Sequence, residues 1–390
     1  MADQMSAAVD GEGPAEGGRR SRRRLLQVSL VVALVAGAFV IAAALRAGSV
    51  PTPGVASAAQ FMVTTVAGTG VEGFVDGPAQ TATFSGPAGV AVDRTCDPAC
   101  GSATGIVYVA DTYNNRIRRV DTLKSEVTTY GPSDVFFRPQ SVAVDNSGVV
   151  YVADTGNQCI RAIDPGTRAV TTVAGLCDKK YGFRDGATNT AMFNAPRGVA
   201  VNFSGDAIYV ADAGNNRIRQ ILRSKDGSYA TDTLAGSGVI GFADGQGLAA
   251  TFDYPSALAF DVNRLIVSDT SNTRIRTVSL DEGTTPRGSV NTLAGSTPGY
   301  LNGAAASAQF TEPLGVSVDA NGIIYVADWG RIRTIDTSGI VATFAGSGEQ
   351  GFSDGPVNSA IFNQPMGVTV DYNGTVYVGD YGNQRIRRLK

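Results

Sequence analysis

Short apolar runs recur along the chain after residue 61, and polar or glycine turns separate each run from the next. In the stretch 193–221, Gly198-Val-Ala-Val precedes Ile208-Tyr-Val-Ala-Asp212, and Arg217-Ile-Arg219 follows. Runs of about four to six β-branched or aromatic residues bounded by Gly, Asn or Asp are typical of strands and too short for helices. The pattern predicts an all-β protein.

The run that ends in aspartate occurs six times. The copies are spaced about 43 to 59 residues apart, and a period in this range is typical of propeller blades. A Phe-x-x-Pro step precedes each copy, as in Phe193 to Pro196. The six aligned aspartates are Asp111, Asp154, Asp212, Asp269, Asp328 and Asp380.

Each copy contains four strand-like runs, here called a (G-V-A-V-D), b (Y-V-A-D), c (R-I-R) and d (V-T-T-V-A-G). Inner runs that are apolar on both faces need neighbouring sheets on both sides, which a ring provides. The repeats open with a lone d run at 62–67 and end with a c run at 385–390. We therefore predict a six-bladed β-propeller of four-stranded antiparallel blades, in which the first strand completes the last blade.

The ordered motif P-x-G-V-A-V-D, I-Y-V-A-D-x-x-N-x-R-I-R and V-x-T-x-A-G closely resembles the NHL-repeat family of six-bladed propellers. The resemblance covers roughly residues 62–390. Two copies depart from it. The fifth has a shortened turn, Asp328-Trp-Gly-Arg331, and the second lacks a G-F-x-D-G segment and carries Cys159 where other copies have Arg.

The first 61 residues have a different composition. Residues 1–24 are polar, Gly-rich and end in five arginines, which predicts a disordered cytoplasmic tail. Residues 25–45 carry no charge and are long enough to cross a bilayer as a transmembrane signal anchor, and 46–61 form a linker. The positive-inside rule then places the propeller, 62–390, outside the cytoplasm. Secretion after cleavage near Ala56-Ser57-Ala58 is the alternative.

Four cysteines fall as two pairs, Cys96/Cys100 and Cys159/Cys177. The chain has no histidine, and the spacings do not form two close C-x-x-C pairs, so disulfides are favoured over zinc. Asn202 and Asn373 begin N-x-S/T sequences and are glycosylation acceptors if the source is a eukaryote.

Strand order predicts which connections share a face of the disc. The b–c turns and the long d–a loops emerge on one face, which the predicted anchor leaves pointing outward. The a–b and c–d turns emerge on the other.

Because the aspartate that ends each b strand recurs in every copy, we expect it to satisfy turn N–H groups and to pair with arginines such as Arg116 and Arg118 rather than to perform chemistry.

The positions predicted to line the ring axis carry no carboxylate. We therefore predict no catalytic residues, no bound metal and no cofactor. Zinc-dependent lyases that resemble this fold use histidines, which are absent here. A calcium-dependent lactonase- or esterase-like hydrolase acting at the axis stays the alternative. The axial positions are Ala88, Gln140, Arg197, Ser256, Leu314 and Met366.

Departures from the repeat are the best candidates for specificity. We expect Trp329, Tyr113, Tyr381 and Tyr300 to lie on the outward face, and aromatic residues are enriched at binding interfaces. The interpretation is a membrane-anchored scaffold that binds a protein or glycan. A nucleic-acid partner is not expected, because the net charge is −3 and five of the arginines lie before residue 25.

Overall fold

The computed structural model describes residues 61–93, 95, 105–281 and 287–390. The tail, transmembrane helix and linker predicted for residues 1–61 lie outside these residues, except for Phe61, and so do Cys96 and Cys100. Within the described ranges, no helix combines the length and apolar character needed to cross a membrane.

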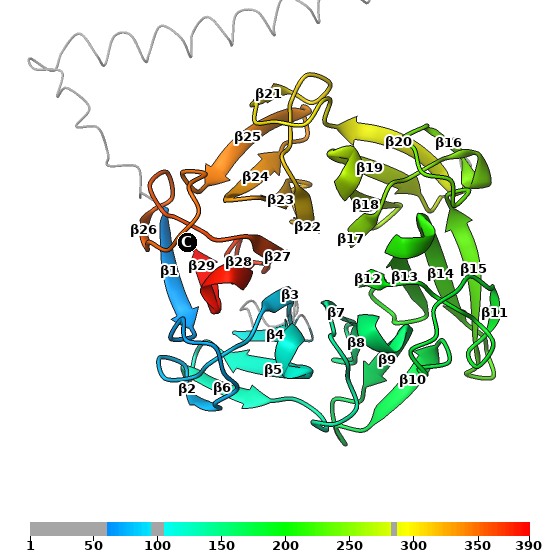
Figure 1. Ribbon diagram of the computed structural model, residues 1–390, viewed down its shortest axis with the longest axis horizontal. Coiled ribbons are helices and arrows are strands. Elements are labelled where there is room, and N and C mark those ends of the chain that lie inside the picture. Colours follow the sequence, from blue (N-terminus) through cyan, green and yellow to red (C-terminus); the bar gives the residue numbers. More distant parts are fainter. Residues whose placement is uncertain (1–60, 94, 96–104, 282–286) are drawn as a thin grey trace, which may run out of the picture. The chain divides into compact units, whose positions relative to one another are not determined.

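Six antiparallel sheets surround a central axis, and each sheet is one blade (Figure 1). The a strands are innermost because their small and β-branched residues pack together around the axis. They are β3 (Pro87–Val92), β7 (Ser141–Val144), β12 (Pro196–Val201), β17 (Pro255–Asp261), β22 (Pro313–Val318) and β27 (Pro365–Val370).

The next two strands of each blade carry the buried Y-V-A-D and R-I-R sequences. The b strands are β4 (Ile106–Asp111), β8 (Val150–Asp154), β13 (Ala207–Asp212), β18 (Arg264–Asp269), β23 (Ile324–Asp328) and β28 (Val376–Asp380). The c strands are β5 (Arg116–Asp121), β9 (Cys159–Ile163), β14 (Arg217–Arg223), β19 (Arg274–Ser279), β24 (Arg331–Ile335) and β29 (Arg385–Leu389).

The d strands lie outside the c strands. They are β6 (Glu126–Thr129), β10 (Val170–Ala174), β15 (Tyr229–Ala235), β20 (Ser289–Ala294), β25 (Ile340–Ala345) and β1 (Met62–Ala67). Single 3₁₀ turns follow five of the b strands, and a sixth lies in a d–a loop. They are η1 (Thr112–Asn114), η2 (Thr155–Asn157), η3 (Ala213–Asn215), η4 (Gly247–Ala249), η5 (Thr270–Asn272) and η6 (Tyr381–Asn383).

Five blades have a fifth, two-residue strand that the sequence did not predict. Each begins at the second glycine of the d–a loop motif and pairs with the d strand of its blade. Blade 2 keeps four strands, since it lacks that motif. The extra strands are β2 (Gly77–Pro78), β11 (Gly186–Ala187), β16 (Gly245–Gln246), β21 (Gly303–Ala304) and β26 (Gly355–Pro356).

The ring closes as predicted. Strand β1 pairs antiparallel with β29, and Figure 1 shows the two ends of the described chain side by side in one blade. The Met62 N–H donates to the Lys390 carbonyl at 2.9 Å. The phenylalanines of five Phe-x-x-Pro steps, such as Phe84 and Phe193, are fully buried in the apolar layers between blades.

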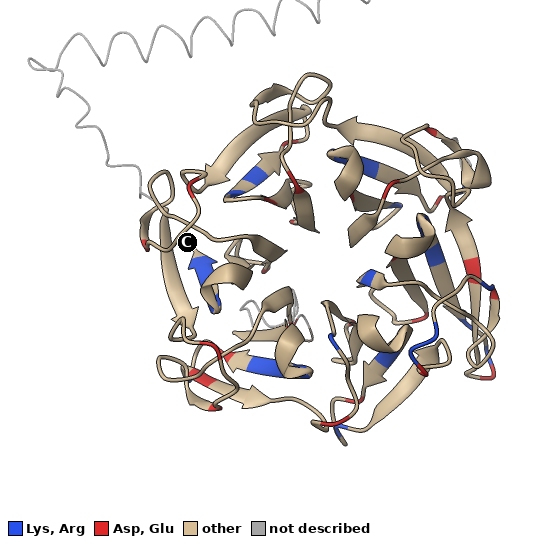
Figure 2. Cartoon of the chain, viewed as in Figure 1, with Lys and Arg blue, Asp and Glu red and all other residues tan. Residues whose placement is uncertain are grey.

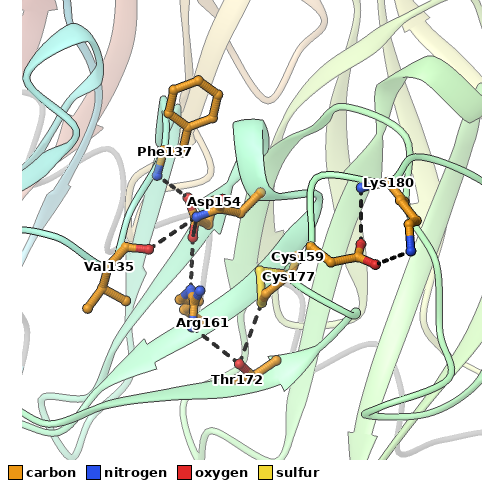
Figure 3. Close-up of a disulfide and its surroundings, with 10 residues drawn as sticks. Val135, Phe137, Asp154, Cys159, Arg161, Thr172, Cys177 and Lys180 are labelled. Carbon is orange, nitrogen blue, oxygen red and sulfur yellow. Dashed lines mark hydrogen bonds and ion pairs between the residues drawn. A yellow bond between two sulfur atoms is a disulfide. The ribbon is translucent and has the colours of Figure 1, made fainter.

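A disulfide joins Cys159 to Cys177, as one of the two predicted pairs requires (Figure 3). In the repeat, Cys159 occupies the position of the first arginine of strand c. In blade 5 that arginine, Arg331, donates to the Ser347 carbonyl at 2.9 Å and lies against Gly348 (φ +92°). Cys177 occupies the place of this glycine and also has a positive φ of 53°. The disulfide therefore replaces, with a covalent bond, an arginine contact made elsewhere in the ring.

Candidate functional site

The six repeated aspartates are structural, as predicted. Asp111 is fully buried and accepts hydrogen bonds from the Ser85 backbone N–H at 2.7 Å, the Asn114 amide at 2.8 Å and the Arg118 guanidinium at 2.7 Å. Arg118 is the second arginine of R-I-R. The first, Arg116, instead lies over the Phe74 ring. Burial raises the pKa of these carboxyls, to about 6 for Asp212, while the paired Arg219 opposes the rise.

A second carboxylate, from the d–a loop, meets the same arginine. In blade 3 the fully buried Arg219 side chain lies between Asp212 and Asp185, with Nε 3.1 Å from the Asp185 carboxylate. Figure 2 shows blue Lys and Arg segments on the c strands around the ring. The same loop position holds Asp76, Asp244, Asn302 and Asp354 in blades 1, 4, 5 and 6. The aspartates of these D-G pairs therefore join the loop to the blade.

Side chains after the b strands also connect neighbouring blades. The Thr112 and Thr155 hydroxyls donate to the Pro139 and Pro196 carbonyls of the next blade at 2.7 and 2.6 Å. At this position blades 5 and 6 carry Trp329 and Tyr381 instead. Neither residue makes the threonine hydroxyl contact of the repeat, and Tyr381 instead reaches the neighbouring blade through Tyr113.

Trp329 also has an unusual backbone conformation. It takes φ 59° in the two-residue turn before Arg331. The first central position of such a hairpin turn, when φ is positive, is usually glycine, and a bulky residue there is a conformational outlier. Strain of this kind concentrates at functional sites.

Trp329 and Tyr381 line a pocket of about 200 Å³ at the mouth of the axial channel, on the face of the b–c turns and d–a loops. Leu314 and Met366 supply its apolar surface. Its polar groups are Arg197, Glu312 and Gln364. Arg197 donates from Nε to the Gln140 side chain at 2.6 Å, which fixes the guanidinium at the rim.

The electrostatics of this mouth pocket come from one cation and one anion. Burial raises the pKa of the Glu312 carboxyl; Arg197 lowers it and Asp328 raises it further. The Glu312 backbone N–H donates to Asp328 at 2.8 Å. The carboxylate is partly desolvated and lies within the field of the Arg197 guanidinium, and it can accept hydrogen bonds from a ligand.

Three of the four predicted binding residues lie together. The Tyr381 hydroxyl donates to the Tyr113 hydroxyl at 2.6 Å, and Tyr381 shares the pocket with Trp329. Tyr300 lies elsewhere: its ring stacks on Arg331 and Arg333, and its hydroxyl bonds Thr343 at 2.8 Å. Tyr300 occupies the position of Phe74 and Phe352 in the repeat, and like them it packs on an arginine of strand c.

Glu312 and Gln364 were missed by the sequence reasoning. The six axial positions were predicted correctly and line the channel together, but the search for carboxylates stopped at them. Glu312 and Gln364 stand one residue before the proline of Phe-x-x-Pro, at the pocket rim. Comparison of that x position across the six copies would have found the single acidic residue there.

The predicted modification sites differ in accessibility. Asn373 is exposed in an a–b turn. The Asn202 side chain is occupied within its own turn, donating to Asp206 at 2.6 Å and accepting from the Ala207 N–H at 3.2 Å. Among the described residues, no group of three or more acidic or cysteine side chains is placed to hold a metal ion.

The fold and this site define a six-bladed β-propeller built from NHL repeats. The NHL repeat matches residues 136–163, 193–221 and 362–389, and a Teneurin NHL domain matches 299–358. This supports the resemblance drawn from the motifs.

Similar proteins cover most of this chain but are much longer. SUPPRESSOR OF QUENCHING 1, a chloroplastic protein of Arabidopsis thaliana, is 27% identical over 340 residues, which are 83% of this chain and 27% of that protein. Human NHL repeat-containing protein 2 is 28% identical over 350 residues, which are 80% of this chain and 40% of that protein. The chain spans less than half the length of these relatives.

Solved structures share the fold at low sequence identity. An auxiliary nutrient binding protein from Bacteroides thetaiotaomicron has a TM-score of 0.65 at 17% identity, covering 85% of this chain and 76% of that one. A gluconolactonase from Xanthomonas campestris has a TM-score of 0.56 at 15% identity, covering 84% and 88%. At these identities the likeness shows the fold alone.

Proposed function

We propose that this propeller is a binding module that recognises a glycan at the mouth pocket. The observation that carries the proposal is the pocket itself, in which Trp329 and Tyr381 stand beside Arg197, Glu312 and Gln364. Small-molecule sites combine apolar and aromatic walls with a few polar groups that fix orientation.

The chemistry of the pocket matches a saccharide. An aromatic ring offers an apolar surface to the C–H face of a sugar. The hydroxyls of the sugar both donate and accept hydrogen bonds. Glu312 accepts, Arg197 donates, and the Gln364 amide does both. At about 200 Å³ the pocket is smaller than the roughly 300–1,000 Å³ typical of drug-sized ligands, so it suits one sugar ring at the end of a chain.

Trp329 supplies a test that separates binding from folding. Because glycine suits a positive φ, Trp329→Gly should leave the melting temperature unchanged or raise it, while glycan binding falls at least about tenfold, as for loss of a buried aromatic contact. Residues 47–390 contain all described sheets and are the material for a glycan array followed by calorimetry. Tyr300→Phe, outside the pocket, is the matched control and should bind as the parent does.

A glycan array with no binder, or a binder unaffected by Trp329→Gly, would overturn the glycan proposal. Capture of a protein that Trp329→Gly releases would instead assign the same surface to a protein partner. The nutrient-binding neighbour is compatible with a ligand-binding role.

A hydrolase acting at the axis is the second candidate, favoured by the raised pKa of Glu312. A partly buried carboxyl of this kind can serve as a general acid or base. The gluconolactonase with a similar fold is compatible with such a role. Turnover of a lactone or ester panel, with loss in Glu312→Gln and sensitivity to a calcium chelator, would support it. The absence of turnover with glycan binding retained would favour the binding module.

We also propose that the propeller is displayed outside the cytoplasm, attached through residues 25–45. The Cys159–Cys177 disulfide supports this, since disulfides persist in oxidising compartments. Protease treatment of intact cells should digest the propeller and spare an amino-terminal tag. Release of the propeller into the medium would indicate cleavage instead.

A further inference from the structure

The axial channel has a second mouth on the face of the a–b turns. A cavity of about 590 Å³ opens there, larger than the pocket at the first mouth. Its aromatic lining is Phe203, Phe260 and Tyr372, contributed by blades 3, 4 and 6. Arg197 at one mouth and Phe203 at the other are six residues apart, along strand β12 and the turn that follows it, so the two sites are roughly 20 Å apart.

The aromatic rings form a fixed corner. Phe203 and Phe260 are perpendicular, with interplanar angle 89° and ring centroids 5.5 Å apart. Tyr209 stacks behind Phe260 at 11° and 6.1 Å, so the Phe260 ring is held in place. Phe203 is nevertheless 51% exposed, as is Tyr372. Large aromatic rings that line a cavity and are exposed to solvent indicate a surface that a ligand covers.

All charged side chains that line this second mouth are acidic. They are Asp261, Asp319 and Asp371. Turn N–H groups orient two of them: Asp319 accepts from Asn321 and Ile323, and Asp371 from Asn373 and Thr375, all at 2.8–2.9 Å. Arg264 pairs with Asp261 at 2.8 Å, but it is not among the lining residues.

We propose that this second mouth binds an organic cation, such as an alkylammonium group. A cation is attracted to aromatic ring faces, and aromatic cages recognise quaternary ammonium groups in this way. Carboxylates held by turns add a negative potential. A metal ion fits less well, because the carboxylates of the described residues do not converge in a group of three.

The test compares tetramethylammonium with its neutral analogue of similar size, tert-butanol, by NMR titration of residues 47–390. We expect tetramethylammonium, and not tert-butanol, to shift the resonances of the second mouth. Phe203→Leu keeps an apolar side chain but removes the ring quadrupole, so it should weaken cation binding about three- to tenfold. Added salt should weaken it further.

Equal shifts with both probes, no shift with either, or unchanged affinity in Phe203→Leu would each overturn the proposal. Because Phe203 is half exposed, Phe203→Leu should leave the fold intact, and the melting temperature of the variant checks this directly. Trp329→Gly, at the first mouth, should leave cation affinity unchanged. Failure here therefore remains distinguishable from failure of the glycan proposal.

Discussion

At the scale of single residues, Asp212 and Arg219 form an ion pair with both side chains fully buried. Removing Asp212 leaves the buried Arg219 guanidinium with only the half-exposed Asp185 as a partner, and breaking a buried pair costs about 3–5 kcal/mol. We therefore expect Asp212→Asn to lower the free energy of unfolding by about that amount. Asp185, the outer partner of the same arginine, is 38% exposed, and exposed pairs are worth about 1 kcal/mol or less.

Urea denaturation of Asp212→Asn and Asp185→Asn measures this difference within one blade. Equal losses in the two variants would contradict the view that burial, and not the number of ion pairs, sets the energy of these contacts.

Glu312 predicts how ligand binding depends on pH. If its ionised carboxylate accepts from a sugar hydroxyl, binding is complete above its pKa and is lost as pH falls through it. Burial raises that pKa, so the loss should begin at a higher pH than for a free glutamate. Calorimetry across mildly acid pH should show this decline in the parent and not in Glu312→Gln. A decline that persists in Glu312→Gln would assign it to another group.

Comparison with the repeat separates true departures from apparent ones, as Trp329 and Tyr300 show. Trp329 was recognisable as a departure because its turn is two residues short. Tyr300 looked like a departure as well, but it substitutes for a loop phenylalanine that stacks on arginines in other blades. Position within the repeat distinguishes the two cases, whereas residue type alone does not.

At the scale of elements, blade 2 is held differently from its neighbours. The disulfide closes a segment of sequence separation 18, for which restriction of the unfolded chain contributes about 3 kcal/mol. Cys159→Ser should lower the free energy of unfolding by about this amount, as should reduction of the parent. The double variant Cys159→Arg with Cys177→Gly recreates the pair found in blade 5 and should recover part of the loss.

Chemical denaturation with and without reductant measures all three forms. No recovery in the double variant would mean that the arginine contact depends on other features of its blades. The missing fifth strand of blade 2 is one such feature. These two-residue strands carry no periodicity of their own, which is why strand patterns could not predict them.

At the scale of the whole molecule, six copies and a lone d strand were sufficient to predict the ring and its closure, because each apolar blade face requires a neighbour. The same reasoning located the axial positions. It did not locate Glu312, because the search for carboxylates stopped at the axial positions and did not extend to the residue before each repeated proline. The membrane anchor stays a prediction of the sequence.

Closure by β1 couples the two ends of the chain and should set the cooperativity of the ring. Val63 and Ala67 are buried, and the Asp354 carboxylate that holds Arg387 also accepts from the Thr65 N–H at 2.9 Å. Deleting residues 62–67 removes these contacts and exposes the edge of β29, a template for pairing with another molecule. We expect a lower, broader melting transition and self-association by light scattering.

A circular permutant provides the control. Joining Lys390 to the residue before Met62 is feasible because their backbones are already hydrogen-bonded. Opening the chain in the exposed turn between Lys225 and Asp226 would make β15 the first strand of the chain, and β15 would then complete blade 3 by pairing with β14 at the other end. This permutant should melt like the parent, because closure is moved and not lost. If the deletion variant melted equally well, side-chain packing between blades alone would hold the ring, and the shared blade would be dispensable.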